Sequence, residues 1–95
     1  CIVYKKYIEN PENLNISSRV NGETRQNSNT KNLIFSAPYL IEELSKGMTI
    51  IPGDIIATGT PAGVGMGFKP PKYLKSGDVV ECEIEKIGIL KNIVE

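Results

Sequence analysis

Apolar and polar side chains alternate between Leu14 and Val20, and this pattern predicts a half-buried strand. Leu14, Ile16 and Val20 share one face of that strand. Asn21-Gly22 follows directly, and this dipeptide is a strong hairpin signal because both central residues of a type I′ turn need positive φ. We therefore expect a return strand over Glu23–Gln26, followed by a polar loop over residues 27–30.

A second alternation lies near the other end of the chain. Apolar residues at positions 80, 82 and 84 alternate with Glu81, Glu83 and Glu85, which predicts a strand, a turn over residues 86–88 and a last strand over 89–94. Three carboxylates on one face of a strand could hold a hard cation. The alternation of these glutamates with the apolar residues, which we expect to be buried, explains their positions without a bound cation. We therefore favour a solvent-facing role for the three glutamates.

One short helix is predicted in the middle of the chain. Ser36 is a typical N-cap, the apolar stripe runs from Tyr39 to Leu44, and Lys46-Gly47 is a typical C-terminal end. The apolar run Leu33–Phe35 just before it predicts a short buried segment. Ile2–Ile8, at the start of the chain, is expected to be a short strand or the entry into the fold.

The stretch Ile55–Gly65, IIATGTPAGVG, changes character halfway. It begins as a β-branched run that predicts a short buried strand, and it continues as a Gly/Pro/Thr loop. Glycines let a backbone approach a ligand closely, and Thr58 and Thr60 offer hydroxyl groups. The spacing matches neither the dinucleotide fingerprint nor a P-loop. From spacing alone, a structural loop is therefore favoured over a ligand site.

Other polar residues are open to a functional and a structural interpretation. Asp54 and Asp78 each follow Gly in a turn, where Asp commonly accepts backbone hydrogen bonds, and we expect that structural role. A polar cluster follows the hairpin turn; it comprises Arg25, Gln26, Asn27, Asn29, Thr30 and Lys31. It could line a pocket for a carboxylated substrate, or it could be a solvated hairpin end. The sequence leaves both open.

Composition narrows the function classes. The 95 residues suffice for one small domain with a modest core. The 11 basic and 11 acidic residues balance, which argues against a nucleic-acid or anionic membrane surface, and no apolar run approaches the roughly 20 residues of a membrane span. The lack of His removes the commonest general base. Cys1 and Cys82 lack metal or redox spacing, so we expect reduced thiols in a cytoplasmic protein.

Three motifs, in one order, resemble the C-terminal half of the catalytic domain of the fumarylacetoacetate hydrolase family. They are NGE-x-RQ from Asn21, N-T-x-x-LIFS-x-P-x-LI from Asn29, and PGD at 52–54 followed by TGTP-x-GVG from Thr58. A looser match continues through LKSGDVVECEIEKIG. The resemblance implies a mixed, mostly β roll with one short helix. It also implies enzymes, usually homodimers, that hydrolyse, decarboxylate or isomerise 2-oxo and 2-hydroxydienoic acids, with Mg²⁺ or Mn²⁺ chelating the oxo-acid end.

The resemblance also implies which residues face the substrate. Thr60 would contact the small oxo-acid substrate, Gly59 would shape the same loop, and Thr58 is a weaker candidate. The family's Glu-x-Glu pair, later Asp and catalytic Lys precede the matched segment, so residues 1–95 are expected to be a C-terminal portion without the N-terminal metal-binding part. We therefore assign no catalytic or metal-ligating residue here.

The alternative to a part of an enzyme is a non-catalytic β module that binds a partner through exposed strand edges.

Overall fold

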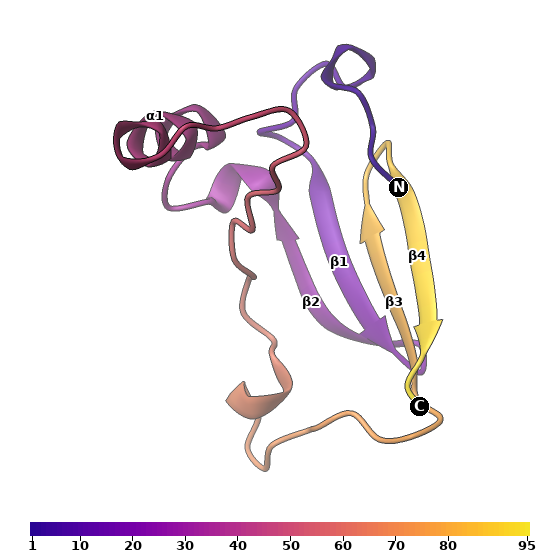
Figure 1. The fold of residues 1–95 in the computed structure, drawn as a ribbon. Coiled ribbons are helices and arrows are strands. Elements are labelled where there is room, and N and C mark those ends of the chain that lie inside the picture. The colour runs from indigo at the N-terminus through magenta and orange to yellow at the C-terminus, as the bar shows by residue number, and fades with distance from the viewer.

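The chain forms a four-stranded antiparallel sheet with one α-helix beside it, as the computed structural model of residues 1–95 shows (Figure 1). The strands are β1 (Asn15–Val20), β2 (Glu23–Asn29), β3 (Val79–Ile84) and β4 (Gly88–Ile93), and the helix is α1 (Ala37–Gly47). Three single-turn 3-10 helices are η1 (Lys5–Tyr7), η2 (Thr30–Asn32) and η3 (Gly65–Gly67). The strand order is β2-β1-β3-β4. The predicted mostly β class with one short helix is confirmed.

The β1–β2 hairpin turns at Asn21-Gly22, as the sequence predicts. The φ angles of these residues are 51° and 80°, so both lie in the left-handed region that a type I′ turn requires. β2 continues to Asn29, because Asn27, Ser28 and Asn29 pair with residues of β1. The expected polar loop over residues 27–30 is therefore wrong for its first three residues. Their polarity suggested a loop, but pairing with β1 holds them extended.

One extra residue interrupts the pairing of β1 with β2. Ser18 lies opposite Gln26 and Arg19 lies opposite Thr24. Arg25 therefore has no residue of β1 opposite it and forms a β-bulge. Successive side chains of a strand point to opposite faces of the sheet. The extra residue therefore places Gln26 on the same face as Ser18.

The cap of α1 is as predicted, but its apolar side has no cover within these 95 residues. The hydroxyl of Ser36 accepts a hydrogen bond from the backbone N–H of Tyr39 at 3.4 Å. No residue of α1 is buried, and Ile41 is 51% exposed. Ile34 is 91% exposed, so the predicted buried run Leu33–Phe35 is wrong. Phe35 stacks on the ring of Tyr39, with centroids 5.2 Å apart, but no part of this chain covers the run.

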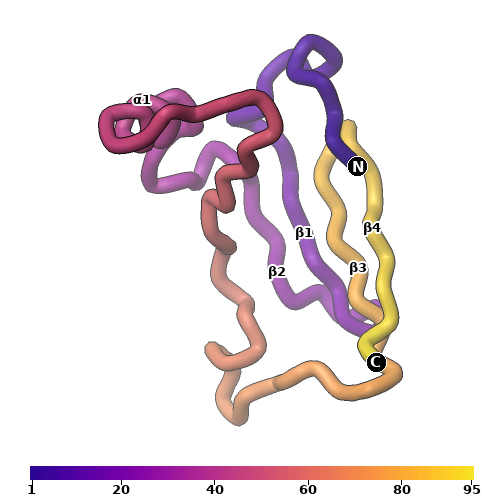
Figure 2. The backbone as a smooth tube through the Cα atoms, in the orientation of Figure 1, coloured from indigo at the N-terminus to yellow at the C-terminus, as the bar shows by residue number.

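The chain between α1 and β3 is one long connection that contains no strand and runs beside β2 before it crosses to β3 (Figure 2). The strand predicted at Ile55-Ile56 is wrong. These residues pair with no other strand, and Ile55 is 86% exposed. A β-branched run becomes a strand only when a neighbour completes its ladder, and this chain supplies none there.

The start of the chain forms no strand, which rules out the first of the two expectations for Ile2–Ile8. The backbone N–H of Tyr7 donates to the carbonyl of Tyr4 at 2.9 Å, which closes the single turn η1. The two tyrosine rings meet edge to face, with centroids 6.3 Å apart. This segment has no adjacent strand, so local i→i+3 bonding satisfies its backbone instead.

The buried core is smaller than the sequence suggested. Only Ile8, Leu14 and Val20 are buried, while apolar side chains on α1 and β4 remain exposed. The expected modest core is therefore wrong for this chain, because its apolar faces are not turned toward one another. The longest helix, α1, has 11 residues, and none of the helices has the length and apolar character of a membrane span.

Candidate functional site

A hollow of about 430 Å³ lies where the connection passes the sheet and the segment leading into α1. The loop residues Thr58, Gly59 and Thr60 all line it, and Pro61 continues the same wall. The remaining lining residues come from the sheet, η2 and the start of the helical region: Ile16, Ser28, Asn29, Thr30, Asn32, Leu33, Ile34, Phe35 and Leu40. The structure thus brings the three predicted binding residues together on one cavity wall. Their role in binding stays a prediction.

The side chain of Gln26, on β2, forms hydrogen bonds to the loop that contains Thr60 and Pro61. Its amide Nε2 donates to the hydroxyl Oγ1 of Thr60 at 2.7 Å and to the carbonyl oxygen of Pro61 at 2.9 Å. The hydroxyl of Ser18 donates to Oε1 of the same amide at 2.9 Å. Three hydrogen bonds therefore hold one amide, and that amide holds Thr60 at the edge of the hollow.

The predicted polar cluster divides into parts with different roles. Thr30 Oγ1 accepts from the backbone N–H of Leu14 and donates to the carbonyl of Pro11, both at 2.9 Å. Asn29 Oδ1 accepts from the N–H of Lys31 at 2.9 Å and caps η2. Thr30 and Asn29 line the hollow, yet their polar atoms already serve the fold. Asn27 is exposed and lies outside the hollow.

Two glycines let the connection approach the sheet and fold back on itself. A Cβ atom on Gly63, whose φ is +107°, would lie 1.9 Å from the carbonyl oxygen of Arg25. A Cβ atom on Gly65 would lie 2.3 Å from the carbonyl oxygen of Lys72. Only glycine fits at either position. The glycines of TGTP-x-GVG are therefore needed for backbone contact at 63 and 65, whereas Gly59 has open space around it.

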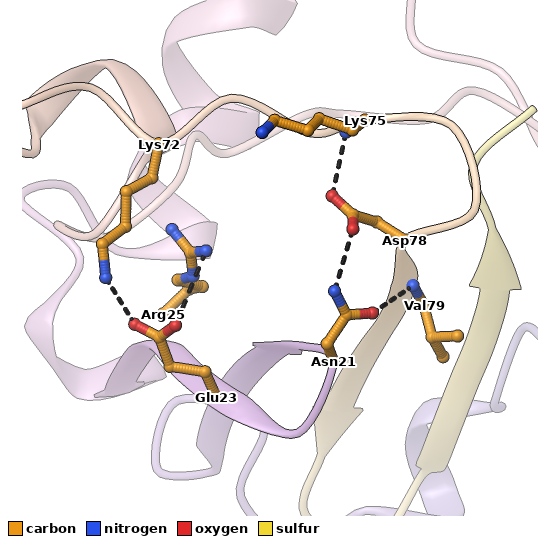
Figure 3. A network of polar contacts seen from close by, with 7 residues as sticks. All are labelled: Asn21, Glu23, Arg25, Lys72, Lys75, Asp78 and Val79. Atoms are coloured by element: carbon orange, nitrogen blue, oxygen red, sulfur yellow. Dashed lines mark hydrogen bonds and ion pairs between the residues drawn. The ribbon is translucent and has the colours of Figure 1, made fainter.

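The bulge residue Arg25 does not line the hollow, and its side chain lies in a charged cluster with Glu23 and Lys72 (Figure 3). Its guanidinium lies 5.3 Å from the ring centre of Phe68, and its Nη2 lies 3.7 Å from a carboxylate oxygen of Glu23. The ammonium of Lys72 contacts the other oxygen of Glu23 at 2.7 Å. Lys72 and Arg25 hold the pKa of Glu23 below its usual value. Arg25 thus ties the bulge to the connection and does not face the hollow.

The two turn aspartates take the structural role that the sequence predicted. Asp78 accepts from the side-chain amide of Asn21 and from the backbone N–H of Lys75, both at 2.8 Å (Figure 3). The Asn21 contact, followed by the Lys75 bond, lowers the pKa of Asp78. Asp54 accepts from the N–H of Ile51 at 2.9 Å. The aspartates therefore close turns, and Asn21 joins the hairpin to the start of β3.

The three glutamates of β3 are engaged within the sheet. Arg19 contacts Glu83 at 2.9 Å and Glu81 at 3.5 Å, which raises the pKa of Arg19, with the Glu83 bond as the larger cause. Lys91 contacts Glu81 at 3.4 Å, and this contact, more than Arg19, lowers the pKa of Glu81. Glu85 accepts from the N–H of Asn15 at 2.9 Å. The face that the sequence predicts to be solvent-facing thus carries a row of contacts to the neighbouring strands.

No three His, Cys, Asp or Glu side chains of the 95 residues converge as a metal site would require. The residues of this chain therefore do not fit the divalent cation that the resemblance implies. Cys1 and Cys82 are both free thiols. What the hollow does present is a set of hydroxyl and amide groups beside an apolar floor.

Residues 1–95 match a family model described as fumarylacetoacetate (FAA) hydrolase C-terminal. The chain belongs to the fumarylacetoacetate hydrolase family. The resemblance seen in the three motifs is thereby confirmed, and enzymes of this family include hydrolases, isomerases and oxaloacetate tautomerases.

Three relatives of this family member show what it is similar to. It is 57% identical over 91 residues to oxaloacetate tautomerase YisK of Bacillus subtilis, covering 96% of this chain and 30% of that protein. A fumarylacetoacetate hydrolase structure from Exiguobacterium antarcticum matches with a TM-score of 0.94 at 48% identity, covering 99% of this chain and 34% of the other. A maleylpyruvate hydrolase from Sphingobium sp. SYK-6, in complex with manganese(II) and pyruvate, matches with a TM-score of 0.87 at 36% identity, covering 98% and 33%. The chain spans about a third of its relatives' length.

Sequence reasoning missed the role of Gln26 and Ser18 at this site. Gln26 belongs to the NGE-x-RQ motif of the family, but the motif alone gave it no specific role. Its face depends on the bulge at Arg25, and a bulge leaves no reliable trace in the alternation of a short polar strand. The contact to Thr60 spans 34 residues of sequence, which local patterns cannot detect.

Proposed function

We propose that this chain forms one wall of the active site of a fumarylacetoacetate hydrolase-family enzyme that acts on a small 2-oxo or 2-hydroxydienoic acid. The reaction would be hydrolysis of a carbon–carbon bond, decarboxylation or tautomerisation. The observation that carries this proposal is the loop Thr58–Thr60 on the wall of the hollow, with the hydroxyl of Thr60 held by Gln26. The relatives' names support the substrate class, since oxaloacetate, maleylpyruvate and pyruvate are all 2-oxo acids.

In this proposal Thr60 donates its hydroxyl hydrogen to an oxygen of the substrate's oxo-acid end. Its Oγ1 already accepts a hydrogen bond from Gln26 and makes no second hydrogen bond within the chain. The hydrogen is therefore free to point toward a bound anionic oxygen, where a charge-assisted hydrogen bond is strongest. Gly59, with its φ of +95° and open surroundings, allows the backbone of the same loop to come close to the substrate.

The divalent cation and the catalytic groups would belong to the rest of the enzyme. This chain has no converging metal ligands, and it spans about 30% of the length of the Bacillus relative. We propose that it is the C-terminal portion of the catalytic domain and that an N-terminal part holds the cation, Mg²⁺ or Mn²⁺. The manganese in the maleylpyruvate hydrolase structure supports a divalent cation in this family.

The remaining part of the enzyme would also cover the exposed apolar surface. Ile89, Leu90 and Ile93 on β4 are each more than half exposed, and so is Ile41 on α1. Exposed apolar surface of this kind commonly marks an interface. We propose that the N-terminal part of the polypeptide, and a second copy in a homodimer, pack on these faces.

Replacement of Thr60 in the full-length enzyme tests the proposed function. Thr60→Val keeps the shape of the side chain and removes its hydroxyl. Loss of one hydrogen bond to a charged group costs about 1–3 kcal/mol, so kcat/KM should fall roughly 5- to 150-fold. Steady-state kinetics with oxaloacetate and acylpyruvates would measure the change.

Thr24→Val is the matched control, because Thr24 is exposed and its side chain makes no hydrogen bond within the chain. It should leave kcat/KM unchanged. Wild-type kinetics for Thr60→Val with every oxo acid tested would refute the binding role of Thr60 and, with it, the proposed placement of the substrate.

A second candidate function is a non-catalytic module that binds a protein partner along β4. The exposed edge of this strand favours it, because an unpaired strand edge can accept another strand. The two candidates differ in one simple respect. The enzyme requires a Glu-x-Glu pair and a Lys elsewhere in the same polypeptide, whereas the module does not.

A further inference from the structure

We infer that Gln26 is a positioning residue that fixes the direction in which the Thr60 hydroxyl donates. This inference rests on the proposed function, because it assigns a cause to the behaviour of the same hydroxyl. It starts from the side chain of one strand residue that bonds to two consecutive residues of the loop, Thr60 and Pro61.

The orientation of the Gln26 amide follows from hydrogen-bond chemistry. The carbonyl oxygen of Pro61 can only accept, and it lies 2.9 Å from one end of the amide. That end must therefore be the NH₂ group, since an oxygen there would face another acceptor. The opposite end is then Oε1, which accepts from the hydroxyl of Ser18 at 2.9 Å.

This orientation determines what the Thr60 hydroxyl can do. The NH₂ group has no acceptor lone pair, so Thr60 Oγ1, 2.7 Å away, must accept from it. The hydroxyl hydrogen of Thr60 is then excluded from this contact and is available on the side that lines the hollow. Gln26 thus makes Thr60 a donor toward the cavity, which suits an anionic oxygen of an oxo acid and disfavours a ligand that presents a donor.

The near-isosteric variant Gln26→Glu reverses this polarity. At neutral pH the introduced carboxylate can only accept, so the Thr60 hydroxyl turns its hydrogen toward the carboxylate and away from the substrate. In the full-length enzyme, kcat/KM should fall about tenfold or more, comparable to the loss in Thr60→Val. Protonation of the carboxyl restores a donor, so the ratio of variant to wild-type activity should rise as the pH is lowered toward the ordinary carboxyl pKa of about 4.3.

Non-additivity separates a positioning role from a general structural one. Added to Thr60→Val, Gln26→Glu should cause no further loss of kcat/KM, and the pH-dependent recovery should disappear. Asn27→Asp is the matched control, because Asn27 is the exposed neighbour whose side chain makes no hydrogen bond within the chain, and the change adds the same charge. It should leave kcat/KM close to that of the wild type.

Ser18→Ala serves as the second variant if Gln26→Glu does not yield folded enzyme. It removes the donor that holds Oε1 and should cause a smaller loss of kcat/KM, which again should vanish in the Thr60→Val background.

Each contrary result has a separate meaning. Wild-type kinetics for Gln26→Glu, beside an impaired Thr60→Val, would overturn the positioning role and leave the proposed function standing. A loss in Gln26→Glu that is independent of pH and persists in the Thr60→Val background would also overturn it, in favour of a structural role. Wild-type kinetics for Thr60→Val would overturn both.

Discussion

Replacement of Gly63 by Ala tests the contact that holds the loop against the sheet. The Cβ atom would lie 1.9 Å from the carbonyl oxygen of Arg25 and 2.9 Å from its carbonyl carbon. Both atoms are backbone atoms of the bulge, so no side chain can move aside. An ordinary contact begins near 3.4 Å, so the loop or the bulge must shift by about 1.5 Å, the difference between 3.4 and 1.9 Å.

Two costs add at this position. A residue with a Cβ atom pays about 1–2 kcal/mol for a positive φ, and Gly63 has a φ of +107°. Overpacking a close contact costs about 1–3 kcal/mol more. Gly63→Ala should therefore lower the free energy of unfolding by roughly 2–5 kcal/mol, measured by urea denaturation of the full-length enzyme.

Gly53→Ala is the matched control for the first cost. Gly53 has a φ of +100°, but no atom lies within 4 Å of the position its Cβ would take. It should cost only about 1–2 kcal/mol, so the difference between the two variants isolates the contact with Arg25. Equal free energies of unfolding in Gly63→Ala and Gly53→Ala would refute the argument that the loop rests on the bulge.

Two further predictions concern charged groups. The pKa of Asp78 lies below its ordinary value of 3.8, so its stabilisation is fully present above about pH 3.8 and is lost as the pH falls through the lowered folded pKa. Asp78→Asn should therefore flatten the fall of the unfolding midpoint between about pH 5 and pH 2.5, and parallel acid limbs would contradict this. Calorimetric titration of the 95-residue chain with Mg²⁺ should show no tight single site, because Arg19 already engages Glu81 and Glu83; tight one-site binding would restore the metal hypothesis for β3.

The parts of the fold that the sequence predicted well depend on local chemistry. Asn21-Gly22 specifies its own turn, and Ser36 specifies the start of α1, because each acts within three or four residues. The strands with clear alternation, β1 and β3, were found within one residue at each end. These features need no knowledge of the rest of the chain.

The parts that it predicted wrongly depend on partners far away in the sequence. Ile55-Ile56 has the composition of a strand, but no neighbour in this chain completes its ladder. Ile34 has the character of a core residue, but nothing here covers it. Residues 27–29 are too polar to suggest a strand, yet β1 holds them in one. At the candidate site, the motif indicates Thr58–Thr60 as candidate binding residues. The contact of Gln26 with Thr60 could not be predicted, because the direction of the Gln26 side chain depends on the bulge.

The bulge at Arg25 determines which face of the sheet the later side chains of β2 point to. If β2 paired with β1 residue for residue from the Asn21-Gly22 turn, without the bulge, Gln26 would lie opposite Ser17 and its amide would emerge on the other side of the sheet. Ser28 would change sides with it and leave the wall of the hollow. A hairpin of the same residues with a regular ladder would keep its turn but lose the hydrogen bonds of Gln26 to Thr60 and Pro61. In this protein, the irregularity of one strand aligns two distant segments.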